Sequence, residues 1–286
     1  MDCGAWGESD KQRRKGRARG EHELTTELPL SWLQPDWPAP SHVRALMTDR
    51  HGGVSAAPYD SMNLGDHVGD RPSDVMSNRL RLQAALGRRP LFLQQVHGVD
   101  TLHLNAKLAD GLKADACLSV SSDVACTIMV ADCLPVLLCD AQGTWVAAAH
   151  AGWRGLAGQG GVGVLENLLA QAEPKRSAPG DILAWLGPCI GPAAFEVGPE
   201  VRAACCDADA QAASFFEPNA QGKFQADLAG LARQRLKRLG LTQIFGNDSQ
   251  STWCTVTQAS SFFSHRRDLR LVGQSGRMAA CIWLDF

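Results

Sequence analysis

Residues 124–155 read VACTIMVADCLPVLLCDAQGTWVAAAHAGWRG and contain the strongest strand pattern in the chain. Three apolar runs, at 124–130, 135–139 and 144–149, are separated by a short break after the first run and by the turn signal Gln142-Gly143 after the second. Short apolar runs bounded by turn residues are typical of strands. This segment therefore predicts neighbouring strands joined by short connections.

The alternation of strands with helices extends over the rest of the chain. Further strands are expected at 91–96, 101–104, 115–120, 182–186 and 278–284. Helices are expected at 74–86, 162–172 and 227–239. Leucine and valine recur at helical spacing in these three segments, and Gly87 and Gly240 provide stop signals after the first and third. Helices interspersed with a mostly strand interior predict a layered α/β (α+β) packing rather than a barrel of repeated βα units.

The composition fits one domain with ample core material. The chain has 286 residues, 45% of them hydrophobic, with no linker between two patterned halves and no apolar run of membrane-spanning length. Basic residues crowd positions 11–19, and no hydrophobic stretch follows them to make a secretory signal. We therefore predict a basic, disordered extension over 1–40, a single catalytic domain over 41–286, no membrane partner and a cytoplasmic location.

Charge and cysteine content exclude two other classes of protein. Taking the six basic residues of positions 11–19 from the total of 28 leaves 22 against 30 acidic residues, so the body of the chain is acidic. An acidic body is a poor candidate for binding the phosphate backbone of a nucleic acid. Ten cysteines in a chain of this length, without a secretory signal, do not predict a disulfide framework.

Three residues that can hold a metal follow or end strand-like runs. His97 lies in QVHG after the apolar run 91–93, Cys133 in ADCLP after 127–130, and His150 in HAGWRG after 145–149. Two imidazoles and one thiolate leave one coordination position open, which is how catalytic zinc is held. The spacing alone leaves a simpler reading open, because free cysteine is usually a small buried hydrophobe and a lone histidine an ordinary polar group.

These motifs resemble those of a known family. QVHG, ADCLPVLL, HAGWRG, GPCIGPAAFEVG at 187–198 and FFSHRRD at 262–268 are closely similar to the YfiH-like family. Its members are variously labelled laccase-domain polyphenol oxidase, purine nucleoside phosphorylase and peptidoglycan editing factor. The resemblance also includes SMNLG at 61–65, Ala114-Asp115 and SGR at 275–277, so it extends from about Val43 to the C-terminus.

The resemblance implies both a fold and an activity. It implies a single α/β domain, a layered sandwich with central mixed sheets flanked by helices, in which His97, Cys133 and His150 hold a zinc ion. It further implies phosphorolysis of adenosine, inosine, guanosine or methylthioadenosine and deamination of adenosine. The expected partners are a small nucleoside and phosphate, with no nucleic acid, and the expected state is a monomer or homodimer.

Charged residues beside the motifs are candidates for anion binding. Arg154 follows His150 closely in a glycine-flanked loop, and a guanidinium matches two phosphate oxygens. Arg79 could do the same, although it lies within a predicted helix and could equally be an ion-paired surface residue. Arg266 could close over a ligand. Its neighbour His265 departs from the tyrosine expected there, which puts any role of a hydroxyl at that position in doubt.

Four polar residues are candidates for binding or orienting roles. Asn63 could bind ribose hydroxyls or cap a turn. Gln95 and Asp132 flank ligands, and metal-bound histidine usually donates its second ring N–H to an oxygen acceptor, so both could orient the ligands. Glu196 could act as a general acid or base, although an ordinary surface glutamate is equally consistent with the sequence.

Two other functions remain open. A copper oxidase is one, because two histidines, one cysteine and a weak axial thioether also describe a blue-copper site; Cu2+ is the alternative cofactor. A multicopper oxidase, however, needs histidine clusters for its other coppers, and the eight histidines of this chain include no HxH pair. The second alternative is a metal-free hydrolase that edits peptidoglycan precursors, with Cys133 as nucleophile and His150 as base.

Overall fold

The computed structural model describes residues 1, 32–172, 178–207 and 209–286. The basic cluster at 11–19, and with it most of the extension predicted over 1–40, lies outside the described residues. From Trp32 onward the chain contacts the body of the protein. Trp32 is 6% exposed, and Leu33 exchanges two backbone hydrogen bonds with Met47. The ordered body therefore includes residues 32–40, which the sequence assigns to the extension.

A four-stranded sheet has the strand order β1-β13-β5-β2. Its strands are β1 (Val43–Met47), β13 (Met278–Leu284), β5 (Val124–Val130) and β2 (Arg89–Phe92). β13 pairs antiparallel with both β1 and β5, and β2 runs parallel to β5. All residues of β5 and β13 are buried, so both strands read as continuous apolar runs.

A six-stranded sheet has the order β12-β8-β6-β7-β4-β3. Its strands are β12 (Gln243–Gly246), β8 (Ile182–Leu186), β6 (Leu134–Asp140), β7 (Val146–Ala151), β4 (Ala116–Ser119) and β3 (Thr101–His103). The four inner strands are antiparallel to their inner neighbours, and each edge strand runs parallel to its neighbour. A small third sheet contains β10 (Phe216–Pro218), β11 (Phe224–Ala226) and β9 (Glu196–Val197).

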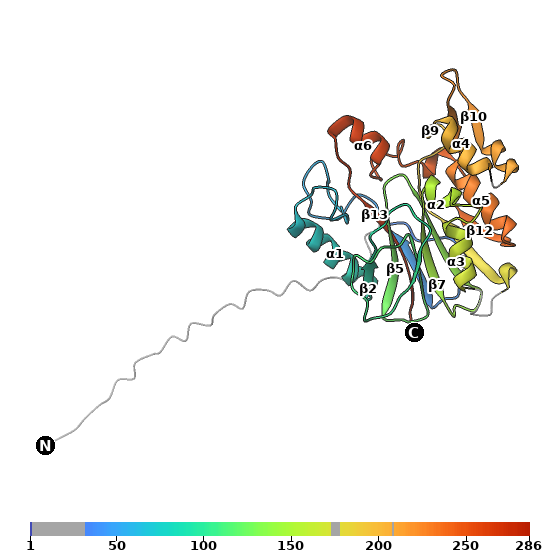
Figure 1. The fold of residues 1–286 in the computed structure, drawn as a ribbon. Helices are drawn as coiled ribbons and strands as arrows, with labels where there is room; N and C mark the ends of the chain where they lie inside the picture. The colour runs from blue at the N-terminus through green and yellow to red at the C-terminus, as the bar shows by residue number, and fades with distance from the viewer. Residues whose placement is uncertain (2–31, 173–177, 208) are drawn as a thin grey trace.

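The two large sheets pack face to face between layers of helices. Alternate residues of β5 face opposite sides of the sheet, so Ile128 joins the core between the sheets, whereas Met129 joins the core beneath α1 (Pro72–Leu86). The other face of the six-stranded sheet is covered by α2 (Trp153–Ala157), α3 (Val164–Ala172) and α5 (Leu228–Arg238) (Figure 1). The result is one α/β/β/α sandwich, as predicted.

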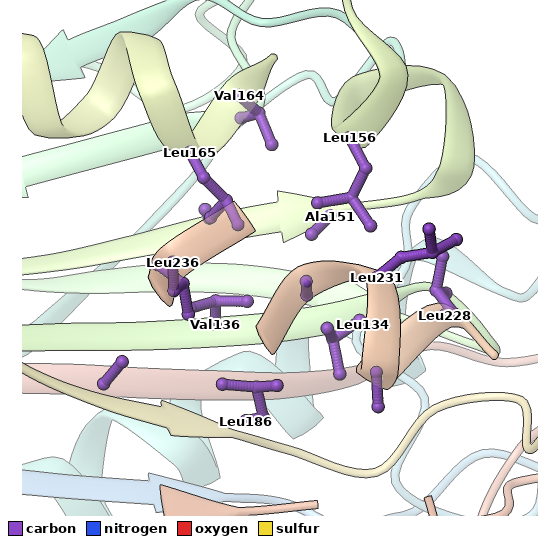
Figure 2. Packing of buried hydrophobic residues seen from close by; sticks show 14 of the residues in the cluster. Leu134, Val136, Ala151, Leu156, Val164, Leu165, Leu186, Leu228, Leu231 and Leu236 are labelled. Atoms are coloured by element: carbon purple, nitrogen blue, oxygen red, sulfur yellow. The ribbon is translucent and has the colours of Figure 1, made fainter. Parts of the chain in front are cut away.

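Helix α5 is held to the sheet by apolar packing and by one buried ion pair. Leu228, Leu231 and Leu236 lie over residues of β6 and β8, as Figure 2 shows. At the edge of this contact Arg235, 7% exposed, pairs with Glu166 of α3 at 2.7 Å. Arg235 also donates to the backbone carbonyl oxygens of Ala157, at the end of α2, and of Gly161, in the connection to α3. The pair therefore fixes α5 and α3 to each other and to the connection between α2 and α3.

All three predicted helices are confirmed, within a few residues at their ends, and several short elements were not predicted. The latter include α4 (Pro199–Cys206), α6 (His265–Val272), β1 and β12. Short 3-10 helices lie at Pro179–Asp181, Ala210–Phe215 and Ser251–Trp253. The cysteines of the described residues are free, as predicted. None of the helices in the described ranges combines the length and apolarity needed to cross a membrane.

Candidate metal centre

His97, Cys133 and His150 converge although they are distant in sequence. Their ligand atoms all lie within 4.8 Å of one another, and Cys133 Sγ is 3.7 Å from His97 Nε2. The two imidazole rings are 4.8 Å apart between centroids and inclined at 68°. Within the described residues this is the only group of three or more His, Cys, Asp or Glu side chains so arranged.

The three residues lie on segments that belong to, or connect, the two large sheets. β5 belongs to the four-stranded sheet and β6 to the six-stranded sheet, so the chain crosses between sheets at residues 131–133. The antiparallel register pairs Leu134 with Ala151 and Pro135 with His150, which brings Cys133 beside the end of β7. His97 and Asp132 have φ values of 61° and 86°, an unfavourable region for residues other than glycine, and such strained conformations gather at functional sites.

Asp115, immediately before β4, connects the two histidines. Its carboxylate accepts hydrogen bonds from the backbone N–H groups of Val96, His97 and Gly98 at 2.7–3.1 Å. It is also 2.8 Å from His150 Nδ1. Asp115 is completely buried, so these hydrogen bonds replace the water that a carboxylate needs. One side chain therefore holds the left-handed turn of His97 and the orientation of the His150 ring.

Gln95 and Asp132, which the sequence suggests as residues that orient the ligands, make no hydrogen bond to the ligand side chains among the described residues. Gln95 exchanges two hydrogen bonds with the backbone of Met129 and thereby ties its loop to β5. Asp132 accepts hydrogen bonds from the hydroxyls of Thr255 and Ser264 and from the backbone N–H of Arg266. Both residues hold the segments that carry the site, whereas the described partner of the His150 ring is Asp115.

The protonation of the cluster suits a metal site. Burial raises the pKa of the Cys133 thiol, but the charge of His150 and hydrogen bonds from both histidines outweigh this effect and bring the pKa to about 6. Burial lowers the pKa of His150, but the Cys133 charge and the Asp115 hydrogen bond outweigh this and raise it to about 9. Without a metal, Cys133 and His150 therefore form a thiolate–imidazolium pair at neutral pH.

The donor set fits a tetrahedral metal ion. Two ligands that share such an ion, with a Zn–S bond of about 2.3 Å and a Zn–N bond of about 2.1 Å, lie roughly 3.6 Å apart. The separation of 3.7 Å between Cys133 Sγ and His97 Nε2 matches this geometry. Because His150 Nδ1 bonds to Asp115, its Nε2 is the nitrogen that can bind the metal.

Gly152 lies against two of the ligands. A Cβ atom added at this position would lie 3.0 Å from Cys133 Sγ and 3.1 Å from His97 Cδ2. The φ of Gly152 is −71°, so the backbone itself would accept any residue. The glycine is therefore required for space beside the ligands and not for its conformation.

The ligands face a cavity of about 400 Å³. Cationic and imidazole side chains from four segments of the chain line it, namely His67, Arg154, His265, Arg266 and Arg277. Apolar side chains line it as well, namely Val130, Trp153, Ile190, Phe195 and Leu228. Of the candidates from the sequence, Gln95, Asp132, Arg154 and Arg266 line the cavity.

The two predicted arginines of the cavity are held differently. Arg154 is exposed, and its guanidinium lies 4.4 Å from the centre of the Trp153 ring. Arg266 Nη1 donates to the backbone carbonyl oxygens of Ala194 and Glu196 at 3.4 and 3.2 Å. Arg154 is therefore free to reach a ligand from the rim, whereas Arg266 is partly engaged with the cavity wall.

Asn63, Arg79 and Glu196 do not line this cavity. Asn63 is completely buried; its side chain donates to Asp70 and accepts from the backbone N–H groups of Gly65 and Arg277, so it caps a turn. Arg79 pairs with Asp66 and lies over the Phe92 ring. The Glu196 carboxylate bonds to Lys223 at 2.7 Å, which lowers its pKa. Their positions match the structural alternatives that the sequence left open.

Comparison with known proteins places these residues in a family. The family model described as multi-copper polyphenol oxidoreductase laccase matches residues 44–285. A purine nucleoside phosphorylase of Pseudomonas aeruginosa is 51% identical over 257 residues, which cover 89% of this chain and 99% of the relative. The purine nucleoside phosphorylase YfiH of Escherichia coli is 50% identical over 254 residues, which cover 88% of this chain and 98% of the relative.

Solved structures agree with the sequence comparison. A Neisseria meningitidis protein of known crystal structure has a TM-score of 0.81 and 44% identity, covering 90% of this chain and 100% of its own. YlmD from Geobacillus stearothermophilus has a TM-score of 0.79 and 29% identity, covering 91% of this chain and 98% of its own. With a matching fold, a matching family model and relatives near 50% identity, this chain belongs to the laccase-like YfiH family.

Proposed function

We propose that this protein is a zinc-dependent purine nucleoside enzyme. It would cleave adenosine, inosine, guanosine or methylthioadenosine with phosphate, giving the base and ribose 1-phosphate, and would also deaminate adenosine. The observation that carries the proposal is the convergence of His97, Cys133 and His150 at a cavity rich in cationic side chains. The relatives named purine nucleoside phosphorylase support the reaction class.

Zinc is favoured over copper by the ligands of the described residues. A bound zinc ion supplies a Lewis acid that polarises an oxygen of the substrate or of water. A multicopper oxidase needs further histidine clusters, and the described ranges contain the single group around Cys133. Metal analysis of the purified protein distinguishes the two ions, because a blue-copper site colours the protein.

Phosphorolysis suits the charges of the cavity. In this reaction the bond from C1′ of the ribose to the purine nitrogen breaks, a bond from C1′ to a phosphate oxygen forms, and the purine takes up a proton. The phosphate needs cationic partners, and Arg154, Arg266 and Arg277 line the cavity. The Asp132 carboxylate, which would repel phosphate, already accepts three hydrogen bonds from Thr255, Ser264 and Arg266.

Deamination of adenosine uses the same cavity without phosphate. Water replaces the amino group at C6 of the purine, and ammonia leaves. Zinc deaminases assist this reaction with a glutamate. Glu196, which the sequence offers as a general acid or base or as an ordinary surface glutamate, pairs with Lys223 and does not line the cavity. The proposal of deamination therefore depends on the metal site alone, without an assisting glutamate in the cavity.

A metal-free hydrolase is a second candidate, favoured by one observation. Cys133, His150 and Asp115 form a chain in which the carboxylate orients the imidazole and the imidazole lowers the pKa of the thiol to about 6. Cysteine hydrolases activate their nucleophile in this way. A peptidoglycan precursor would be the substrate in that case. Removal of metal by a chelator would leave such a hydrolase active and would inactivate a zinc enzyme.

The decisive experiment analyses products by mass spectrometry. Metal-quantified protein is incubated with adenosine, with and without phosphate. The proposal predicts ribose 1-phosphate and adenine only when phosphate is present, and inosine under both conditions. If ribose 1-phosphate formed but inosine did not, only the phosphorolysis part of the proposal would stand. If zinc-loaded protein gave neither product, the proposal would be refuted.

A further inference from the structure

The cavity is lined by two chemically different groups of side chains. Trp153, Ile190, Phe195 and Leu228 belong to the core cluster beneath α5, or pack against it, and are apolar. Arg277, just before β13, and His265, at the start of α6, can donate hydrogen bonds to a ligand.

The metal ligands line the same cavity as both groups of side chains. Trp153 follows directly after Gly152, where an added Cβ would lie 3.0 Å from Cys133 Sγ and 3.1 Å from His97 Cδ2. A ligand that fills the cavity would therefore contact the apolar side chains, the metal centre and the cationic side chains.

The side chain of Arg277 is held in position by several contacts within the protein. Its backbone N–H donates to Asn63 Oδ1 at 2.9 Å, and Nη1 donates to the carbonyl oxygens of Ser275 and Gly276 at 2.9 and 3.1 Å. Its Cγ packs against Gly65, where an added Cβ would lie only 2.7 Å away. The guanidinium is therefore held in position before any ligand binds.

Part of this guanidinium remains available to a ligand. Within the described residues, Arg277 Nη1 carries the side-chain hydrogen bonds, and neither Nε nor Nη2 has a hydrogen-bond partner. The carboxylate of Asp132 accepts hydrogen bonds from three other donors, and none comes from Arg277 among the described residues. His265 likewise lacks a side-chain hydrogen bond to another described residue. Such donors at a cavity wall suit an anion with several oxygens.

We propose, as a refinement that rests on the proposed function, that Arg277 and His265 bind the phosphate while the purine packs against Trp153 and Phe195. The ribose then lies between them, beside the metal centre, where its C1′ meets both the leaving purine and the attacking phosphate oxygen. Arg154, the arginine that the sequence favours for phosphate, lies on the Trp153 ring and so at the purine end.

The test separates phosphate binding from nucleoside binding. Inorganic phosphate is titrated calorimetrically into metal-quantified protein without nucleoside, and the KM values for phosphate and inosine are measured separately. Arg277→Met should weaken phosphate binding by at least about tenfold, since it removes a charge-assisted donor pair, and should change the inosine KM by less than about twofold. Trp153→Leu should show the reverse pattern.

Arg270 provides a matched control. It is an exposed arginine further along α6 and does not line the cavity, so Arg270→Met should leave both binding constants unchanged. Arg277→Lys keeps the charge but loses the fork of donors, and an intermediate phosphate affinity is expected. Thermal unfolding of each variant identifies losses that come from misfolding, and Arg277→Lys remains the informative variant if Arg277→Met does not fold.

Wild-type phosphate affinity in a folded Arg277→Met protein would overturn this assignment, even if phosphorolysis itself were confirmed. Equal increases in both KM values would overturn it too, because they would indicate a general disturbance of the cavity. If wild-type protein binds phosphate through Arg277 but never cleaves a nucleoside, the anion site stands and the proposed reaction fails.

Discussion

At the scale of single residues, the chemistry of the site depends on the proton balance between Cys133 and His150. A thiol buried in a protein normally keeps its proton, as the raised pKa values of Cys126, Cys139 and Cys281 illustrate. Cys133 is the exception because two imidazoles stabilise its thiolate. The site therefore does not have to pay the full cost of deprotonating a thiol when a metal binds at neutral pH.

This balance predicts the pH dependence of alkylation in metal-stripped protein. The thiolate is the reactive form, so the rate of Cys133 alkylation by iodoacetamide should fall as the pH drops through about 6 and should level off above it. His150→Gln should move the midpoint upward, because it removes the charge that stabilises the thiolate. Peptide mass mapping follows each cysteine, with Cys133→Ala as the blank. A midpoint near 9 in the wild type would contradict the thiolate–imidazolium pair.

Asp115 provides a second prediction at this scale. Asp115→Asn keeps the size of the side chain but replaces one acceptor oxygen by a donor, so it should loosen the His97 turn and misorient the His150 ring. Loss of such a supporting residue typically weakens metal binding by about 10- to 100-fold. Competition with a chromogenic chelator measures this affinity. Asp123→Asn, at a surface turn, is the matched control, and equal zinc affinities in the two variants would refute the role of Asp115.

The sequence singled out the three residues of the candidate metal site but not the residues that support them. His97, Cys133 and His150 could be identified because each is a ligand type placed where an apolar run breaks off. Asp115 and Arg277 belong to the motifs Ala114-Asp115 and SGR that support the family resemblance, but nothing in the sequence assigned either residue a role. Their roles depend on contacts across 35 and 214 residues of sequence, to His150 and Asn63, which the spacing within a motif does not show.

At the scale of secondary-structure elements, the paired ends of β6 and β7 set the position of the ligands. Their register brings Cys133 and Gly152 together at the point where both strands leave the sheet. Gly152 then begins the turn into α2 and acts as its N-cap. The close approach of these two chain segments is possible because position 152 has no side chain.

Gly152→Ala should therefore damage the metal site without unfolding the protein. The new methyl group would meet Cys133 Sγ and His97 Cδ2 at about 3 Å, so one ligand has to move by a few tenths of an ångström. We expect zinc affinity to fall roughly tenfold, as for other changes that displace ligands. Gly180→Ala, where an added Cβ meets no atom within 4 Å and the backbone φ is not positive, is a control for glycine replacement. Unchanged zinc affinity would show that the site adapts to the methyl group.

The long helices and inner strands could be predicted because their buried apolar residues recur at regular spacing, and the same burial stabilises them. The helices α1, α3 and α5 each present apolar residues to the core at regular spacing, and the inner strands are buried on both faces. Helix α6 escaped prediction because its apolar residues Leu269, Leu271 and Val272 are exposed, so its sequence has no core-facing pattern. It begins at Ser264, whose side chain caps the helix and also bonds to Asp132. Its position is thus determined by the site.

At the scale of the whole molecule, the metal centre lies where the two large sheets are joined. His97 follows β2 of the four-stranded sheet, His150 belongs to β7 of the six-stranded sheet, and Cys133 lies on the crossing between β5 and β6. The layered packing could be predicted from the alternation of helices and strands. Which strand ends meet could not, because this depends on the strand order, in which β13 lies between β1 and β5.

Because the three ligands come from both sheets, bound zinc should stabilise the whole sandwich. A ligand that binds only the folded state adds roughly 4 kcal/mol to the free energy of unfolding when its free concentration is about 1,000 times its Kd. Stripping the metal with a chelator should therefore lower the Tm of the wild type by several degrees, and adding zinc should restore it. Cys133→Ala should show neither change. If neither the chelator nor added zinc changed the Tm of the wild type, no metal ion would be bound between the sheets at this point.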